Sequence, residues 1–290
     1  MTRPQLSFEF FPPHSPAASM RLWRSVERLA PLGPKFVSVT YGAGGTTRER
    51  TRTAIATIRE RARLDVAGHL TCVGASREET LDVAREFARL GVRRIVALRG
   101  DPPKGAEKFE PHPDGYASAA ELVEGLRSVG DFQIAVAAYP EKHPEAASLA
   151  TDIDALKAKF DAGATSAITQ FCFETETFLR FRDAAAAAGV PGPIVPGILP
   201  VENFTKMKGF AARCAAGVPG WMDTAFGNAQ TEEEAHLLAV SIAAEQASDL
   251  MAEGVEHLHF YTLNNPDLTF DICHALGIEA SGVNAVAGGA

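Results

Sequence analysis

Cysteine is scarce in this chain, with four residues among 290, and no two of them form a CxxC pair. A disulfide framework needs a regular set of closely placed cysteines, and a zinc site needs paired Cys or His ligands. The spacing therefore predicts reduced, mostly buried thiols in a cytosolic protein, and no metal site. The four residues are Cys72, Cys172, Cys214 and Cys273.

Long apolar runs and an excess of basic residues are also missing. No stretch approaches the roughly 18 continuous apolar residues of a membrane span, and the first apolar run is short, contains an acid and stops at Pro12-Pro13, unlike a secretory signal. The net charge is −8, whereas nucleic acids and anionic membranes attract clustered Lys and Arg. We therefore expect a globular cytoplasmic protein that binds neither nucleic acid nor a membrane.

Short β-rich runs alternate with helical patterns along almost the whole chain. In residues 145–161 the apolar side chains fall at i, i+4, i+7 and i+11, which lines one helix face, and residues 77–90 have similar spacing. The alternation predicts a single-domain α/β fold, a (β/α)8 TIM barrel over residues 1–278, with a disordered tail at 279–290. The predicted strands are residues 6–11, 35–40, 66–72, 93–98, 132–138, 165–170, 193–199 and 256–261.

The predicted junctions from helix to strand share a glycine just before the β run. Glycine suits a helix C-terminus because the residue that ends the helix is often left-handed. A doubly wound open sheet is the alternative fold, but GAGG at 42–45 lacks the third glycine of a dinucleotide-binding turn. The junction glycines are Gly91, Gly163, Gly189 and Gly254.

Polar side chains close nearly every predicted strand, although the strand bodies are apolar. In a (β/α)8 barrel the active site lies at the C-terminal ends of the strands, so these side chains are expected to form one ring. The alternatives are that strand ends are polar because they meet solvent, and that Arg99 and Asp101 form a structural ion pair. The ring comprises Glu9, Thr40, Tyr41, His69, Arg99, Gly100, Asp101, Tyr139, Gln170, Leu199, Pro200 and Tyr261.

Glu9 stands in the apolar run SFEFF at residues 7–11, where strand alternation separates it from both flanking phenylalanines. An acid that faces the interior of a barrel loses water, and desolvation raises the pKa of a carboxyl. We therefore expect a raised pKa for Glu9, which a proton donor needs at neutral pH. His69 is either a site residue or a core histidine. His257 and His259 are interpreted as structural, because no matching acid or third histidine is evident.

Two loop lysines leave a different chemistry open. Lys104 and Lys142 lie in predicted strand-to-helix loops, whereas a Schiff-base lysine more typically comes from the strand itself. A barrel lyase or aldolase is therefore the weaker alternative. The chain has no GxSxG nucleophile elbow, and GDPPKG at 100–105 lacks the GK[ST] of a phosphate-binding loop.

Eight short motifs follow one another in order from residue 7 to residue 264. They are SFEFFPP at 7–13, VSVTYGAGG at 37–45, HLTC at 69–72, ALRGDPP at 97–103, AAYPEKHPEA at 137–146, DAGATSAITQFCF at 161–173, PGILP at 196–200 and FYTLN at 260–264. Together they resemble the methylenetetrahydrofolate reductase family of the bacterial type, and the match extends to about residue 278. Any one motif is weak evidence, whereas the series with consistent spacing is strong.

The resemblance implies a flavoprotein oxidoreductase of one-carbon metabolism and methionine biosynthesis. Such an enzyme reduces 5,10-methylenetetrahydrofolate to 5-methyltetrahydrofolate, and FAD relays hydride from NADH or NADPH in a ping-pong sequence. Its expected partners are these small-molecule substrates and further copies of the same chain in a homo-oligomer. Two alternatives stay open: the barrel lyase or aldolase, and a non-catalytic barrel that only binds folate.

The resemblance also implies roles for individual residues. Glu9 is similar to a general acid that protonates the departing N10, and Asp101 to an acid beside the flavin that favours the cationic iminium intermediate. A carboxylate stabilises such a cation by Coulomb attraction in a dry site. The folate or the nucleotide is expected at Gln170, Phe210, Tyr261 and Lys206. FAD is expected at Thr40, Tyr41, His69, Arg99, Gly100, Asp101, Tyr116, Ala137, Tyr139, His143, Asp152 and Lys159, where the Arg99 and Lys159 cations neutralise phosphates.

Two positions depart from the family pattern. Lys206 stands where some relatives have a glutamine that reaches the second substrate, and Asn265 stands where an arginine often follows TLN. These departures leave open how the folate tail or the nucleotide is held, and whether NADH or NADPH is preferred.

Overall fold

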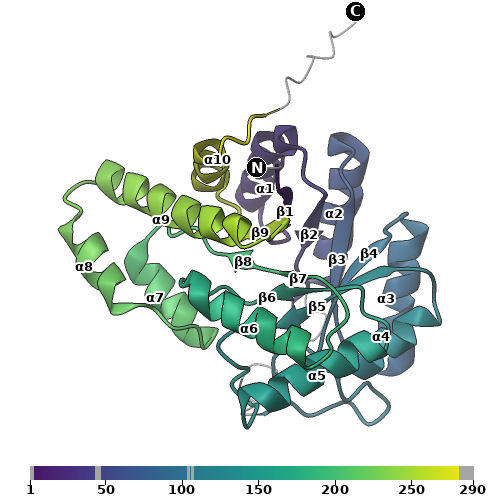
Figure 1. Ribbon diagram of the computed structural model, residues 1–290. Coiled ribbons are helices and arrows are strands. Elements are labelled where there is room, and N and C mark those ends of the chain that lie inside the picture. The colour runs from purple at the N-terminus through teal and green to yellow at the C-terminus, as the bar shows by residue number, and fades with distance from the viewer. Residues whose placement is uncertain (1–2, 43–46, 103–104, 106–107, 281–290) are drawn as a thin grey trace, which may run out of the picture.

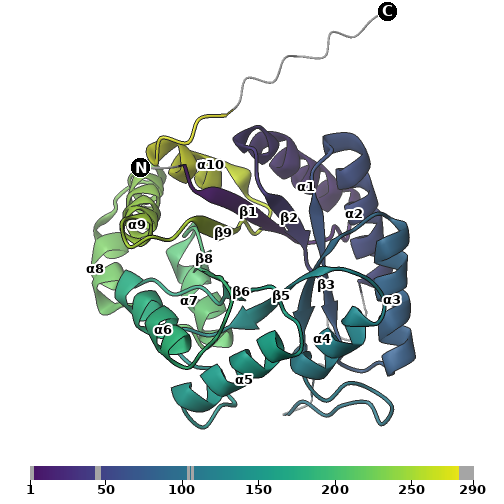
Figure 2. The same cartoon turned by 45° about the vertical axis from the view of Figure 1, so that its right-hand side comes forward.

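Short parallel strands form one ring at the centre of the molecule (Figures 1 and 2). The computed structural model describes residues 3–42, 47–102, 105 and 108–280. In this part of the chain the sheet has nine strands in the order β7-β6-β5-β4-β3-β2-β1-β9-β8. They are β1 (Gln5–Phe10), β2 (Phe36–Val39), β3 (Val66–Thr71), β4 (Arg94–Leu98), β5 (Gln133–Ala138), β6 (Ser166–Thr169), β7 (Ile194–Val195), β8 (Gly197–Ile198) and β9 (His257–Tyr261).

The ring closes through an interrupted strand. β7 and β8 are the two halves of the strand predicted at 193–199, and Pro196 separates them because proline has no N–H to give to the ladder. β7 pairs with β6 and β8 pairs with β9, so the two halves join the two edges of the sheet. The predicted (β/α)8 barrel and its eight strand positions are confirmed, and the open-sheet alternative is wrong.

Helices cover the outside of the ring, as the view along the barrel shows (Figure 2). Most strands are followed by one helix, but three helices, α7, α8 and α9, lie between β8 and β9. The helices are α1 (Pro16–Leu29), α2 (Arg48–Ala62), α3 (Arg77–Arg89), α4 (Ala119–Arg127), α5 (Leu149–Asp161), α6 (Thr175–Ala187), α7 (Phe204–Arg213), α8 (Gly220–Asn228), α9 (Glu232–Ala252) and α10 (Pro266–Ala275).

The helix ends follow from the local sequence. Ser76 and Glu79 form a capping box at the start of α3, and the Ser118 and Ser148 hydroxyls accept backbone N–H groups at the starts of α4 and α5. All four predicted junction glycines have positive φ, which confirms the left-handed helix ends. The helix-to-strand connections are therefore short, and the longer strand-to-helix loops gather at the opposite end of the barrel.

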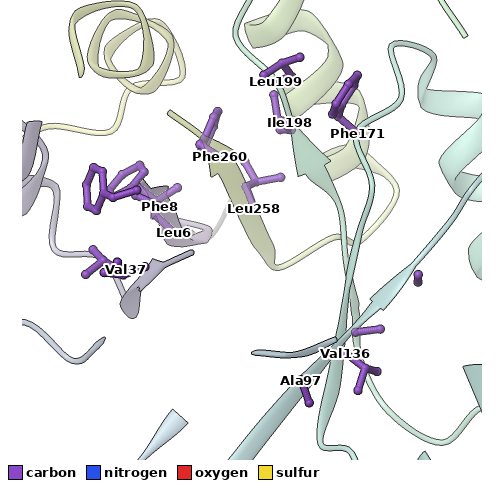
Figure 3. Close-up of a cluster of buried hydrophobic side chains, with 14 of the residues drawn as sticks. Leu6, Phe8, Val37, Ala97, Val136, Phe171, Ile198, Leu199, Leu258 and Phe260 are labelled. Carbon is purple, nitrogen blue, oxygen red and sulfur yellow. The ribbon is translucent and has the colours of Figure 1, made fainter. Parts of the chain in front are cut away.

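The main hydrophobic core lies between the strands and the helices. Leu6 and Phe8 of β1 and Leu258 and Phe260 of β9 belong to it (Figure 3), and the Phe8 and Phe260 ring centroids are 6.1 Å apart. Burial of side chains of this size contributes about 1.5–3 kcal/mol each. A second, smaller cluster comprises Phe36, Ala67, Val96, Ala135, Ile168 and Val195. Because strand side chains alternate, the residues between those of the main core face the interior of the ring.

Three further expectations concern the chain as a whole. Cys72, Cys172 and Cys273 are buried and Cys214 is partly buried, all as free thiols, which agrees with the predicted burial of most of these side chains. Within the described ranges, none of the helices has the length and apolar character needed to cross a bilayer. Of the predicted tail, residues 281–290 lie outside the described part of the chain.

Candidate active site

A cavity of about 440 Å³ lies at the C-terminal ends of β3, β4 and β5 and is called here the upper cavity. It brings together most of the side chains predicted to hold a cofactor, as expected for this end of a (β/α)8 barrel. Those in its wall are Tyr41, Arg99, Gly100, Asp101, Ala137, Tyr139, His143, Asp152 and Lys159. Three other predicted positions, Thr40, His69 and Tyr116, do not line it.

Gly100 shapes the turn that presents Asp101 to the upper cavity. Its φ is +90°, and a Cβ at this position would lie 2.6 Å from a methyl carbon of Val73. No other residue type fits here without strain, because both the backbone conformation and the space require glycine. The turn leaves the Asp101 side chain exposed at the mouth of the cavity.

Two cations lie in the wall of the upper cavity. The half-buried Lys159 side chain donates from its ammonium to the Ala137 carbonyl oxygen at 2.8 Å. Partial desolvation lowers the pKa of Lys159 to about 8, although Asp152 opposes that shift. Arg99 pairs with Glu145 at 2.6 Å, with its guanidinium 4.6 Å from the centroid of the Phe109 ring. Arg99 thus bonds Glu145, and no Arg99–Asp101 ion pair forms, so that structural alternative is wrong.

The loop after β5 is fixed by its own polar contacts. The Asp152 carboxylate accepts the His143 backbone N–H at 2.8 Å, and the His143 ring packs edge-on against Tyr139 with centroids 4.6 Å apart. The Lys142 ammonium donates to the Ala146 carbonyl oxygen at 2.7 Å. The lysine proposed for a Schiff base is therefore engaged with the backbone of its own loop, and the other one, Lys104, lies outside the described residues.

The donor set of the upper cavity fits an anionic dinucleotide. The Thr71 hydroxyl faces the cavity and has no hydrogen-bond partner among the described residues. Ala117, Ser118 and Ala119 bring the N-terminus of α4 into the wall, and a helix N-terminus together with two cations favours phosphate. Thr71 and Ser118 are not among the site residues predicted from the sequence. Ser118 was detectable as the first residue of a Ser-x-x-Glu helix start, whereas a threonine in a strand carries no such signal.

Two of the three positions outside the upper cavity have structural contacts. The Thr40 carbonyl oxygen accepts the Thr51 hydroxyl at 2.9 Å, which ties the end of β2 to α2. Tyr116 is buried, with the Arg77 guanidinium 5.0 Å from its ring centroid. Neither side chain lines the upper cavity.

Glu9 lies beside two buried histidines inside the barrel. One of its carboxylate oxygens is 3.3 Å from His69 Nε2 on β3 and 3.7 Å from His259 Nε2 on β9. Burial raises the pKa of Glu9, but the neighbouring imidazoles of His69 and His259 together outweigh it, and the net pKa lies below the ordinary value. The predicted rise of this pKa is therefore wrong. The interpretation that His259 has no acid or further histidine nearby is wrong as well.

The backbone around Glu9 is held by the loop that follows β9. The Thr262 hydroxyl donates to the Glu9 carbonyl oxygen at 2.6 Å, and the Asn264 side-chain amide both accepts from and donates to the Phe11 backbone, at 2.9 and 3.0 Å. Asn265 caps α10 by accepting the Asp267 N–H at 3.4 Å. The position that departs from the family pattern therefore starts a helix, and its neighbour Asn264 fixes the end of β1.

The residues predicted to bind a substrate lie at or after the C-terminal ends of β6, β8 and β9, and Tyr261 is paired with Glu9 in the sheet. Phe210 is half-buried and stacks on Phe171 with ring centroids 5.5 Å apart, and Phe171 in turn contacts the edge of Tyr261 at 6.2 Å. The Gln170 side-chain oxygen accepts the Phe171 N–H at 3.0 Å. Lys206 is exposed in the first turn of α7, one turn from Phe210, so both can face the same ligand.

Comparison with known proteins decides the family. The sequence profile of the methylenetetrahydrofolate reductase family matches residues 1–277. The chain belongs to this family. It is 50% identical to the 5,10-methylenetetrahydrofolate reductase of Pectobacterium carotovorum subsp. carotovorum over 278 residues, which are 96% of this chain and 91% of that protein. It is 47% identical to the 5,10-methylenetetrahydrofolate reductase of Escherichia coli K12 over 275 residues, which are 94% of this chain and 91% of that protein.

Comparison with solved structures bears on the fold alone. The crystal structure of 2,3-dimethylmalate lyase superposes with a TM-score of 0.54 at 11% identity and covers 94% of this chain and 79% of that chain. The crystal structure of oxaloacetate acetylhydrolase superposes with a TM-score of 0.52 at 13% identity over 92% of this chain and 77% of that chain. At such low identity the match shows a shared barrel, and the chemistry must be argued from the site of this methylenetetrahydrofolate reductase family member.

Proposed function

We propose that this protein reduces 5,10-methylenetetrahydrofolate to 5-methyltetrahydrofolate, with FAD held in the upper cavity and NADH or NADPH as the electron donor. The observation that carries the proposal is that a cavity suited to an anionic cofactor and a carboxylate close to two histidines occur at the same end of the barrel. The upper cavity holds two cations and a helix N-terminus, and β3 contributes Thr71 to its wall. Two residues earlier on the same strand, His69 lies 3.3 Å from the Glu9 carboxylate, which also has His259 at 3.7 Å. The relatives at 47–50% identity, which bear the name of this activity, support the assignment.

Lys159 and Arg99 are the residues that would bind the diphosphate of FAD. Both are cations in the cavity wall, and the Thr71 hydroxyl adds a free donor and acceptor. When bound there, FAD would supply the hydride relay between the reduced nicotinamide nucleotide and the folate, and the proposed order of half-reactions is ping-pong. The protein residues bind and orient the reactants, exclude water and move the proton.

Reduction of the methylene bridge adds one hydride and one proton to the folate, and Glu9 is the proposed proton donor to the departing N10. Its pKa is lowered, so the carboxylate is ionised at neutral pH and must receive the proton within each catalytic cycle. While ionised, Glu9 stabilises the positive charge that ring opening creates. Asp101, at the mouth of the upper cavity, adds a second carboxylate for the same cation.

The folate is proposed to bind over Phe210 and Gln170. The stacked Phe171–Phe210 pair offers an aromatic face to a flat ring, and an amide side chain such as Gln170 can pair with the polar edge of a pterin. Lys206 is exposed at the start of α7, where its ammonium can pair with the carboxylates of the glutamate tail. This lysine is the proposed replacement for the glutamine found in some relatives.

Anaerobic reduction of the purified protein tests the proposal. The protein should be yellow, or take up added FAD, and its flavin absorbance should bleach with NADH or NADPH and return on addition of 5,10-methylenetetrahydrofolate. A colourless protein that takes up no FAD contradicts the proposal. Borohydride trapping on a lysine would favour the lyase instead, although the Lys142 ammonium is already held by its own loop.

The variant Glu9→Gln separates the two half-reactions. If Glu9 serves only the folate, its flavin should still be reduced by the nucleotide while folate turnover falls by about 10²-fold or more, as for loss of a general acid. Equal loss of both half-reactions would instead assign Glu9 to the cofactor or to the fold.

A further inference from the structure

A line of polar side chains runs down the inside of the barrel from Glu9 to its opposite end. His259 Nε2 lies 3.7 Å from the Glu9 carboxylate, and His259 Nδ1 lies 2.7 Å from the Ser7 hydroxyl oxygen. The same hydroxyl oxygen lies 2.9 Å from His257 Nε2. Parallel register places Ser7 beside His259 and Glu9 beside Tyr261, so all four groups belong to the two adjacent strands β1 and β9.

The lower end of this line reaches a second cavity. His257 is partly exposed and lines a cavity of about 460 Å³ at the N-terminal ends of the strands, called here the lower cavity. Several of its lining side chains, such as Gln5 and Lys35, are exposed, so the cavity opens to solvent. A polar cavity of this size holds water readily.

The surroundings of the line are apolar. Phe36 contacts both imidazoles, with its ring centroid 5.8 Å from that of His257 and 6.3 Å from that of His259. Ser7 and His259 are fully buried, whereas the Glu9 side chain is 14% exposed. Glu9 is therefore only slightly exposed at its own end of the barrel, and the polar line connects it to the lower cavity through two hydrogen bonds and one 3.7 Å step.

The proton positions along this line follow from the acceptor at its upper end. His259 Nε2 makes no hydrogen bond to the described residues, and the Glu9 carboxylate 3.7 Å away only accepts when ionised. A proton on His259 Nε2 suits this neighbour, and His259 Nδ1 then accepts the Ser7 O–H. The Ser7 oxygen then accepts from His257 Nε2–H, which leaves His257 Nδ1 as an acceptor. The two hydrogen bonds of the line, from His257 to Ser7 and from Ser7 to His259, thus point from the lower cavity toward Glu9.

We propose that His257, Ser7 and His259 form a proton relay that reloads Glu9 from the lower cavity. This inference rests on the proposed function, since it supplies the one proton that each folate reduction consumes. His257 Nδ1 takes a proton from water while His257 Nε2 gives its own to the Ser7 oxygen. The Ser7 O–H proton passes to His259 Nδ1, and the His259 Nε2 proton passes to the Glu9 carboxylate after a small rotation of that group closes the 3.7 Å step.

The charge balance of the relay is complete. Each of the three relay groups gains one proton and loses one, so only Glu9 changes its charge, and water in the lower cavity becomes hydroxide that the solvent neutralises. Rotation of the Ser7 hydroxyl and tautomer exchange of the imidazoles restore the starting arrangement. His257 acts as a neutral group throughout, because burial and the neighbouring His259, Lys35 and Arg94 hold its pKa at about 3. Glu256 is the acid that lines the same cavity.

Two variants interrupt the relay without changing Glu9. Ser7→Ala removes the central hydroxyl, and His257→Gln keeps an N–H donor for Ser7 but has no second nitrogen to take up a proton. Ser38→Ala is the matched control, because Ser38 is equally buried and its hydroxyl has no hydrogen-bond partner among the described residues. His257→Gln also protects the test against misfolding, since this side chain is only partly buried.

We expect a defect only in the half-reaction that consumes the proton, which is the reduction of the folate. Steady-state reduction of 5,10-methylenetetrahydrofolate should slow about tenfold or more in Ser7→Ala and His257→Gln, with a larger solvent deuterium isotope effect on kcat. Flavin reduction by the nucleotide should stay within about twofold of the wild type, because that step needs no proton from Glu9. Ser38→Ala should match the wild type in both steps.

The tautomers of the two histidines, measured by NMR, test the relay directly. In the protein labelled with 15N-histidine, nitrogen chemical shifts should report the Nε2–H tautomer for both His257 and His259 at neutral pH, and Ser7→Ala should alter both signals. Nδ1–H tautomers would reverse the hydrogen bonds and overturn the relay. The relay would also be overturned if both relay variants had the wild-type kcat and isotope effect while Glu9→Gln was inactive in folate turnover. That outcome would leave the proposed function intact. Normal folate turnover by Glu9→Gln would instead contradict the proposed function itself.

Discussion

The Tyr261 hydroxyl donates to the Thr169 carbonyl oxygen at 2.7 Å, across the point where Pro196 interrupts the strand between them. Tyr261 ends β9 and Thr169 ends β6, so this bond links the two strands that flank β7 and β8. The Thr169 hydroxyl in turn accepts the Gly197 N–H at 3.0 Å. A residue predicted to bind substrate is therefore also part of the closure of the barrel.

Gly197→Ala is expected to destabilise this closure. A Cβ at Gly197 would overlap the Thr169 carbonyl oxygen and the Tyr261 ring, and neither can move without breaking the Tyr261–Thr169 bond. We expect a loss of about 2–4 kcal/mol in the free energy of unfolding, measured with urea. Gly220→Ala is the control, because nothing lies within 4 Å of a Cβ there, and it should change stability by less than about 1 kcal/mol. Equal effects of the two substitutions would contradict the argument.

The lowered pKa of Lys159 predicts how the affinity for FAD depends on pH. Its pKa of about 8 means that the ammonium is largely charged at pH 7 and largely neutral at pH 9. A phosphate binds the charged form, so the dissociation constant of FAD should rise above pH 8, by up to about tenfold per pH unit. Fluorescence titration from pH 7 to pH 9 measures the slope. Lys159→Met should bind FAD weakly with little pH dependence, whereas Lys157→Met on the same helix, which removes only the exposed Lys157–Asp161 pair, should behave like the wild type.

The low pKa of His257 in the folded protein predicts that the protein is less stable in acid. Its pKa is about 3 in the folded protein, mainly because of burial, against about 6.5 in an unfolded chain. Between these values the unfolded chain takes up a proton that the folded protein does not, so the free energy of unfolding falls as the pH falls. The contribution is at most about 1.4 kcal/mol per pH unit. Urea unfolding at pH 6.5 and pH 5 should therefore show a drop about 1.6 kcal/mol smaller in His257→Gln than in the wild type. The same drop in both proteins would mean that another group is responsible.

Most of the fold was predictable because it depends on local patterns. Each strand is a short apolar run, and each junction glycine marks a left-handed helix end, so these signals lie within about ten residues of sequence. The upper cavity was predictable for the same reason, since strand ends converge at one end of a barrel. The interruption at Pro196 was visible as a proline, although it divides a strand that the pattern predicted as continuous.

The electrostatics of the site were not predictable, because they depend on side chains from distant strands. The pKa of Glu9 falls owing to His69 on β3 and His259 on β9, and only the register of a closed barrel brings the three together. Arg99 likewise pairs with Glu145 from the loop after β5 instead of its neighbour Asp101. The sequence of one strand indicates that its carboxyl is desolvated, which raises the pKa. It does not indicate which charged groups from other strands oppose that rise.

Asp101→Asn tests whether the second carboxylate acts on the folate. Asp101 lies at the mouth of the upper cavity and helps to raise the pKa of Tyr139, which burial, the larger cause, and Asp101 together bring to about 12. Removal of the charge should therefore lower the pKa of Tyr139, and an ultraviolet absorbance titration against wild type measures this without any turnover. If Asp101 also stabilises the cationic intermediate, the folate half-reaction should slow by about 10²-fold, the usual effect of losing one electrostatic partner of a transition state. A shifted Tyr139 titration with unchanged folate kinetics would keep Asp101 in the cavity but remove it from the chemistry.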